Sequence, residues 1–301
     1  QHQRLVDQRP RTERDEAPEL DELGLSKFIA NGYDPELGWV RKPDTSGREQ
    51  GARGAVYWST DAMGARSDPH MEGSPIGVIV VGDSYAFSRQ VEDGAAWPAL
   101  LGKLLGVRVA NFGVGNYGLD QAILRYRRDG RIPQAKVAIL GVVPESIARI
   151  HSAWKHYSEY GNTFAFKPRF RCSGDRPELL ANVIDDPQKF KHYREFLPEL
   201  RERDHFYKTK FRRDMIRTPY IWHWLAKPRN RRLIGLLRER RRRRADGTCS
   251  QALEAAPFRS VLQRNLRMAG EMYGKPEHTA LFKALVLTFA AEARAAGAEP
   301  A

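Results

Sequence analysis

Apolar and polar residues alternate in blocks along the middle of the chain. Ile76–Val81 is a continuous apolar run rich in β-branched residues, which predicts a strand buried on both faces of a parallel sheet. The same pattern predicts two further strands, at Val107–Phe112 and Lys136–Val143, and helices at Trp97–Leu105 and Asp120–Arg128. Strands that alternate with helices at this spacing predict βαβ crossovers and a parallel sheet with helices on both faces.

The segment before the first strand has a weaker pattern. A helix is expected within Pro18–Phe28, and Asn31–Gly47 follows as a loop region punctuated by Gly and Pro. Gly54–Ser67 predicts a short strand with a turn around Asp61.

Residues 150–275 break the strand–helix rhythm and are rich in Arg and aromatic residues. Helical stretches at Gln188–Arg203 and Ile221–Arg240 indicate a mainly helical insertion, and a helix at Glu277–Ala295 resumes the earlier pattern. In this pattern a helix is followed by another strand of the sheet, but no such strand is evident before Ala301. We therefore expect a sheet that is incomplete at the C-terminus.

Four parts follow from this pattern. Residues 1–75 are an N-terminal extension with a lead-in hairpin, and residues 76–150 are the first half of the α/β domain. Residues 151–275 are the helical, Arg-rich insertion, and residues 276–301 return to the domain.

The composition indicates a soluble protein with enough apolar residues to form a hydrophobic core. Of the 301 residues, 41% are hydrophobic and 29% are charged, and the mean hydropathy is −0.59. No apolar stretch is long enough to span a membrane, and no signal peptide is visible. The two cysteines, Cys172 and Cys249, have no metal-ligand spacing and leave the compartment undecided.

The net charge of +13 is concentrated in one segment. Lys227–Arg244 contains ten basic residues against Glu239 alone, so the charge is a local feature. This tract is suited to RNA, anionic polysaccharide or acidic phospholipid. The alternative, which we prefer, is a solvated insert whose aromatic residues dock it onto the domain.

Ser84 directly follows the first predicted strand, in the sequence Gly82-Asp83-Ser84. In open α/β sheets, ligands bind at the carboxyl ends of strands, where a Ser hydroxyl and its own backbone N–H can act on a carbonyl group. Asp and Ser also cap helices routinely, so an ordinary turn is the alternative.

Two more polar loops are expected on the same rim. The Gly-rich loop Gly113–Gly118 follows the second strand and permits close backbone approach to a ligand, although a plain turn explains it equally well. Leu140–Arg149 follows the third strand and offers Glu145 and Ser146, which the start of a helix after Pro144 would also explain.

With these three loops the chain resembles the SGNH (GDSL) hydrolase superfamily. The matching segments are "GDSYAF", "NFGVGNYGLDQ" and, more loosely, "LGVVPES". The segments "YDPELGWVRKPDTSG", "STDAMGARS" and "FAFKPRF" are similar to bacterial members associated with polysaccharide loci, and the resemblance covers about residues 31–170.

The resemblance implies acyl transfer on a three-layer α/β/α, flavodoxin-like sheet, with no metal or cofactor. It places the nucleophile at Ser84 and the oxyanion hole at the N–H groups of Ser84 and of Gly115 or Asn116. The third-block Asn of the family falls on Glu145, which is a departure, because a carboxylate repels an oxyanion.

The family's late Asp-x-x-His pair is not found, and its usual place lies beyond Ala301, so we expect a C-terminally truncated member. A substitute base would have to come from the histidines within the chain, namely His151, His156, His278 or the Asp204-His205 pair.

The function expected from the sequence is a serine-dependent ester hydrolase that acts on a carbohydrate O-acyl ester or a small-molecule ester. One alternative is an O-acyltransferase on the same site. The other is a non-catalytic interaction protein that uses the basic insertion, with nucleic acid as one partner for Lys227–Arg244.

Overall fold

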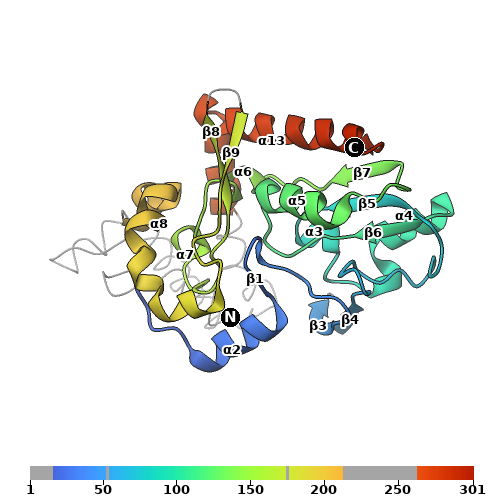
Figure 1. The fold of residues 1–301 in the computed structure, drawn as a ribbon, viewed down its shortest axis with the longest axis horizontal. Coiled ribbons are helices and arrows are strands. Elements are labelled where there is room, and N and C mark those ends of the chain that lie inside the picture. Colours follow the sequence, from blue (N-terminus) through green and yellow to red (C-terminus); the bar gives the residue numbers. More distant parts are fainter. Residues whose placement is uncertain (1–15, 52–53, 174–175, 213–262) are drawn as a thin grey trace, which may run out of the picture.

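A computed structural model describes residues 16–51, 54–173, 176–212 and 263–301 (Figure 1). The basic tract at Lys227–Arg244, the helical stretch at Ile221–Arg240 and Cys249 lie outside these ranges, so the predictions for them stay predictions.

The centre of the described chain is a parallel sheet of four strands with the order β10-β7-β5-β6. The strands are β5 (Ile76–Val81), β6 (Arg108–Asn111), β7 (Val137–Leu140) and β10 (Glu299–Pro300). The α/β class and the three strands expected between residues 76 and 143 are confirmed. The expectation that no strand follows the last helix is wrong, because β10 pairs with β7 and Ala301 N–H donates to the carbonyl of Ala138 at 2.9 Å.

Each face of the sheet carries its own apolar layer. Ile79 and Val81 point into one hydrophobic cluster, and Val78 and Val80 point into another on the opposite face, as expected for a strand with a period of two. Helices cover both faces (Figure 1). The cluster of Ile79 includes α5 (Leu119–Arg125) and α13 (Pro276–Ala295), whereas α4 (Trp97–Leu105) packs on β6 from the other side.

Short elements connect these layers. The strand β5 leads into α3 (Ser84–Phe87), η2 (Asp93–Ala95) precedes α4, and the π-helical η3 (Tyr126–Gly130) extends α5. After β7 come α6 (Ser146–Arg149) and α7 (Lys155–Ser158).

The N-terminal part contains the expected helix and the expected strand from Gly54, which pairs in a hairpin with a strand that was not expected. Asp21 caps α2 (Glu22–Asn31) by accepting from Gly24 N–H at 2.8 Å. The hairpin pairs β3 (Ser46–Gly51) with β4 (Gly54–Ser59). The region predicted as a loop also contains an antiparallel pair of short strands, β1 (Tyr33–Asp34) and β2 (Gly38–Trp39).

The described part of the insertion is less helical than predicted. It contains an antiparallel hairpin of β8 (Arg169–Ser173) and β9 (Arg176–Leu180) in addition to η4 (Pro187–Phe196), α8 (Leu197–Arg203) and η5 (Tyr207–Phe211). Because the hairpin strands are rich in charged residues and largely exposed, their sequence lacks the apolar run that identifies a buried strand. The helix predicted at Gln188–Arg203 is 3-10 in its first part, with a kink at His192.

An aromatic cluster joins the insertion to the N-terminal part. Trp154 stacks on Phe166 with ring centroids 4.9 Å apart, and Phe190 packs edge to face against Phe28 and Tyr33. These contacts pack the insertion against the N-terminal part. Ile147 and Ala148, in α6 after β7, belong to the same cluster, so the insertion also packs beside the rim of the sheet. No helix in the described ranges is long and apolar enough to cross a membrane.

Candidate active site

The turn after β5 presents Ser84 at the carboxyl end of an internal strand. The chain moves from β5 to β6 on one side and later to β7 on the other, so this end of β5 is the point where the strand order reverses. Gly82 has φ 155°, and a Cβ there would lie 2.9 Å from Ala86 Cβ and 3.1 Å from the backbone of Gly141. Only Gly therefore permits so tight a turn, which places Ser84, half-buried, as the first residue of α3.

The buried carboxylate of Asp83 stabilises this turn through hydrogen bonds. Its Oδ1 accepts from Tyr85 N–H at 2.9 Å, and its Oδ2 accepts from Arg149 Nη1 at 2.6 Å. The carboxylate is buried, with 3% of the side chain exposed, and Arg149 also donates to the carbonyl of Tyr117 at 3.0 Å. One guanidinium thus ties together the three rim segments that follow β5, β6 and β7.

The Gly-rich loop lies directly against α3. Asn111 donates from Nδ2 to the carbonyl of Ala86 at 2.9 Å and accepts from Gly113 N–H at 3.0 Å. A Cβ on Gly113 would lie 2.4 Å from Phe87 N, so the loop approaches this closely only with Gly. Further along, Asn116 has φ 69°, a left-handed conformation that Asn tolerates better than most residues.

Three backbone N–H groups on this rim are available for a ligand. Within the ranges that the structure describes, no hydrogen bond uses the N–H of Ser84, Gly115 or Asn116, and none uses Ser84 Oγ. The carbonyl of Gly115 accepts from Trp39 Nε1 at 3.0 Å, which fixes the loop from its outer side.

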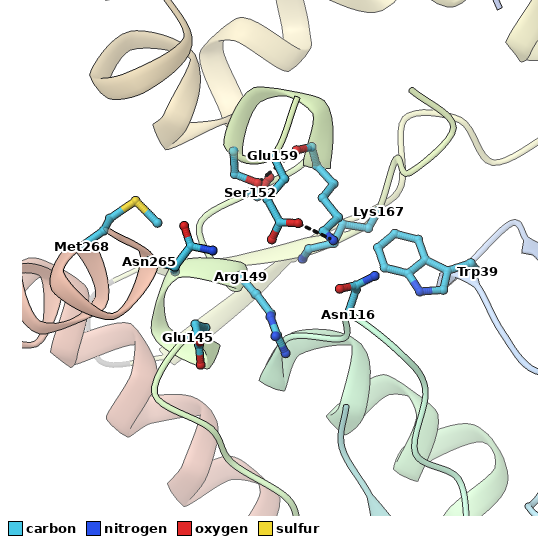
Figure 2. Close-up of a pocket in the computed structure, with 12 residues that line it drawn as sticks. Trp39, Asn116, Glu145, Arg149, Ser152, Glu159, Lys167, Asn265 and Met268 are labelled. Carbon is cyan, nitrogen blue, oxygen red and sulfur yellow. Dashed lines mark hydrogen bonds and ion pairs between the residues drawn. The ribbon is translucent and has the colours of Figure 1, made fainter. Parts of the chain in front are cut away.

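A pocket with a volume of about 70 Å³ opens beside the Gly-rich loop (Figure 2). It contains two of the predicted residues, Asn116 and Glu145, but Ser84 is not part of its wall. Arg149 belongs to the wall and bonds Asp83, so it connects the pocket to the Ser84 turn. The full lining is Trp39, Asn116, Glu145, Ala148, Arg149, Ser152, Lys155, Ser158, Glu159, Lys167, Asn265 and Met268.

Each cation in the pocket wall lies against a carboxylate. Lys155 Nζ lies 3.0 Å from Glu159 Oε2, and Lys167 donates to Asp120, which lies under the pocket wall at the start of α5. Burial lowers the pKa of both lysines, and their carboxylate partners act in the opposite direction. Burial acts to raise the pKa of Glu159, but Lys155 outweighs it and the net pKa is lowered. These pairs were not predicted from the sequence, although Lys167 lies in the "FAFKPRF" segment.

Three of the candidate histidines, His151, His205 and His278, are engaged with one another and not with Ser84. The rings of His151 and His278 have centroids 4.5 Å apart, and that of His205 lies 4.7 Å from His278. Burial and nearby positive charge lower the pKa of His151 to about 2 and that of His205 to about 4. His156 is buried and stacks on Trp154.

Asp204 is not the orienting partner of a base either. It accepts from the backbone of Ala153 and Trp154 at 2.7 and 2.9 Å. Among the described residues, no group of three or more His, Cys, Asp or Glu is arranged to hold a metal ion.

Comparison with known proteins adds little to this geometry. No protein-family model matches the chain, and no match is found among curated proteins. A solved structure of a mutant of the esterase AlinE4 is similar, with 20% sequence identity and a TM-score of 0.22. The match covers 30% of this chain and 51% of the esterase chain, so it spans about half the length of that protein.

Proposed function

We propose that this protein is a serine-dependent ester hydrolase of the SGNH (GDSL) type that acts on a carbohydrate O-acyl ester. The observation that carries the proposal is the Ser84 hydroxyl, half-buried at the end of an internal strand, beside backbone N–H groups that no hydrogen bond uses within the described ranges. Preorganised N–H donors of this kind stabilise the oxyanion that forms when a hydroxyl attacks an ester carbonyl. The strand order, with β5 between β6 and β7, supports a flavodoxin-like sheet.

In the proposed reaction, Ser84 Oγ attacks the carbonyl carbon and passes its proton to a base. The N–H groups of Ser84 and of Gly115 or Asn116 hold the oxyanion. The tetrahedral intermediate expels the sugar alkoxide, which takes up the proton, and leaves an acyl-enzyme that water hydrolyses. Because the described histidines pack elsewhere, the proposal takes its base and the carboxylate that orients it from outside the described residues.

Glu145 has a different place in this proposal from the family's third-block Asn. Its side chain lies at the pocket beside Arg149, and a carboxylate in the oxyanion hole would oppose the charge that develops there. We therefore assign Glu145 to the binding of the alcohol part of the substrate and not to the oxyanion hole.

The test is hydrolysis of an aryl acetate by the wild-type protein and two serine variants. Ser84→Ala should abolish turnover, and Ser74→Ala, which changes a serine before β5 at the opposite end of the sheet, should leave it unchanged. Turnover that survives in Ser84→Ala would contradict the proposal. Transfer of the acetyl group to an added sugar in preference to water would favour the O-acyltransferase alternative.

A further inference from the structure

Three histidines from distant parts of the chain meet in one cluster. His151 follows α6, His205 lies between α8 and η5, and His278 is in the first turn of α13. The ring centroids are 4.5 Å apart for His151 and His278, 4.7 Å for His205 and His278, and 5.8 Å for His151 and His205. His151 and His278 are buried, and His205 is half-buried. The start of α13 therefore contacts the insertion through imidazole rings.

This cluster is suited to neutral rings. In the described part of the chain, His151 Nε2 and His278 Nδ1 are buried and have no hydrogen-bond partner. A protonated imidazole donates from both of its nitrogens, so each of these rings would need an acceptor that its surroundings do not supply. A buried charge without such a partner is strongly unfavourable.

The charged groups around the cluster also oppose protonation. Burial is the main cause that lowers the pKa of all three rings, and the positive charge of Arg169 in β8 adds to it in each case. Lys275, directly before α13, lowers the pKa of His205 and His278 further, whereas Glu277 acts in the opposite direction. Three charged rings would therefore lie against one another and against two cations, with one carboxylate to offset them.

Two of the three segments are tied together by the backbone. The N–H of His205 donates to the carbonyl of His151 at 3.1 Å. Asp204 accepts from the N–H groups of Ala153 and Trp154 at 2.7 and 2.9 Å and from Ser152 Oγ at 3.0 Å. These bonds hold residues 151–154 against residues 204–205 whatever the charge of the rings, and they occupy the carboxylate nearest in sequence to His205.

The third segment, residues 263–278, packs against the other two through side chains. His278 contacts the rings of His151 and His205, and Ala269 and Met272 lie in the aromatic cluster of the insertion. The later part of α13 is held separately, because Leu285 and Phe289 pack in the apolar cluster of the sheet. Repulsion among the rings would therefore separate residues 263–278 from the insertion and leave the rest of α13 in place.

This segment also forms part of the pocket. Residues 263–273 are helical and contribute Asn265 and Met268 to the wall, on the opposite side of the pocket from Trp39 (Figure 2). Separation of the segment would remove this side of the wall.

From this arrangement we propose that the three histidines form a pH switch: in acid they become charged, repel one another and release residues 263–278 from the insertion, which opens the pocket on the side of Asn265 and Met268. The switch acts whether or not Ser84 cleaves an ester. A ring that stays neutral in the closed cluster but binds a proton in the open form favours the open form as the pH falls below about 6.5. Each histidine changes the ratio of open to closed protein by up to about tenfold per pH unit, and three change it by up to about 1,000-fold.

Hydrogen exchange detected by mass spectrometry measures this opening, at about pH 7 and about pH 5 and with correction for the intrinsic exchange rate. A short helix released from its packing is marginal in water, so its amides exchange. We expect the protection of residues 263–279 to fall by at least about 30-fold between the two conditions, which is the effect of one histidine between about pH 6.5 and 5. The protection of β5 and of residues 285–295 should not change.

His205→Asn and His278→Gln each remove one titrating ring and should each reduce this pH-dependent loss of protection by about 30-fold. The matched control is His192→Asn, which changes an exposed histidine beside Glu195 and should behave like the wild type. If His278→Gln does not fold, the half-buried position of His205 makes His205→Asn the variant that decides.

Three exchange results would overturn the proposal: equal protection of residues 263–279 in both conditions, an equal loss in β5, which is acid unfolding of the whole domain, or an undiminished loss in both histidine variants. An NMR titration of the wild type gives a further check that needs no substitution. Ring signals of His151 and His278 that titrate near pH 6.5 while residues 263–279 stay protected would also overturn it.

Discussion

Gly113 is the point where the Gly-rich loop touches α3, and a methyl group there has a calculable consequence. A Cβ on Gly113 would lie 2.4 Å from Phe87 N and 2.8 Å from Ala86 C. These are backbone atoms in a hydrogen-bonded turn, with Phe87 N–H bonded to the carbonyl of Asp83 and the carbonyl of Ala86 bonded to Asn111. No side chain can move to relieve the clash, so the loop or α3 must shift. Overpacking of this kind costs about 1–3 kcal/mol.

The same loop contains its own control. Nothing lies within 4 Å of a Cβ on Gly115, and its φ is not in the left-handed region. Gly115→Ala should therefore change the free energy of unfolding by no more than about 0.5 kcal/mol.

Equilibrium unfolding in urea compares the two variants directly. Gly113→Ala should unfold at a lower urea concentration than Gly115→Ala, with the same dependence of the free energy of unfolding on urea. Its rate of aryl acetate hydrolysis should be about 100-fold lower than that of the wild type, because the displaced loop carries the N–H groups proposed for the oxyanion. Equal stability of Gly113→Ala and Gly115→Ala would show that the loop does not contact α3 as described.

Two further predictions concern buried charge. Arg149→Met removes the partner of the buried Asp83 carboxylate and should lower the free energy of unfolding by about 3–5 kcal/mol. Arg171→Met, which removes one partner of an exposed ion pair, should leave the free energy of unfolding nearly unchanged. Equal destabilisation by the two substitutions would contradict the burial of Asp83. Burial holds the pKa of His151 at about 2 in the folded protein. Below about pH 6.5 the unfolded chain therefore binds a proton at this position that the folded protein does not bind. The free energy of unfolding should fall as the pH decreases, by up to about 1.4 kcal/mol per pH unit. Urea titrations between about pH 7 and 5 should show a shallower decline for His151→Phe and no change of slope for the exposed His192→Asn.

The sheet and its covering helices follow closely from the sequence pattern. The bounds of β5 and α4 agree with the predicted Ile76–Val81 and Trp97–Leu105, because a doubly buried strand and an amphipathic helix each have a local signature. The strand β10 escaped prediction because Glu299–Pro300 is too short for any period and is defined by its pairing with β7. The hairpin of β8 and β9 escaped because its strands lie largely in solvent.

In the candidate site, too, some residues were predicted from the sequence and others were not. The rim loops that carry Ser84 and Asn116 were predicted to lie together, since the carboxyl ends of neighbouring parallel strands share one edge of a sheet. The pocket residues Lys155 and Lys167 were not predicted, because the insertion reaches the rim through aromatic packing between distant segments. Whether the insertion packs there depends on tertiary contacts that no local pattern encodes.

The central claim is that Ser84 is the acyl acceptor. The most direct measurement is to expose the protein to an aryl acetate, quench it with acid, and locate the acetyl group by peptide mass spectrometry. We predict acetylation of Ser84 in the peptide that spans β5 and α3. This label should be absent from Ser84→Ala and present in Ser74→Ala at the level of the wild type. Acetyl groups found only on other residues, or an unmodified Ser84 in protein that turns over the ester, would contradict it.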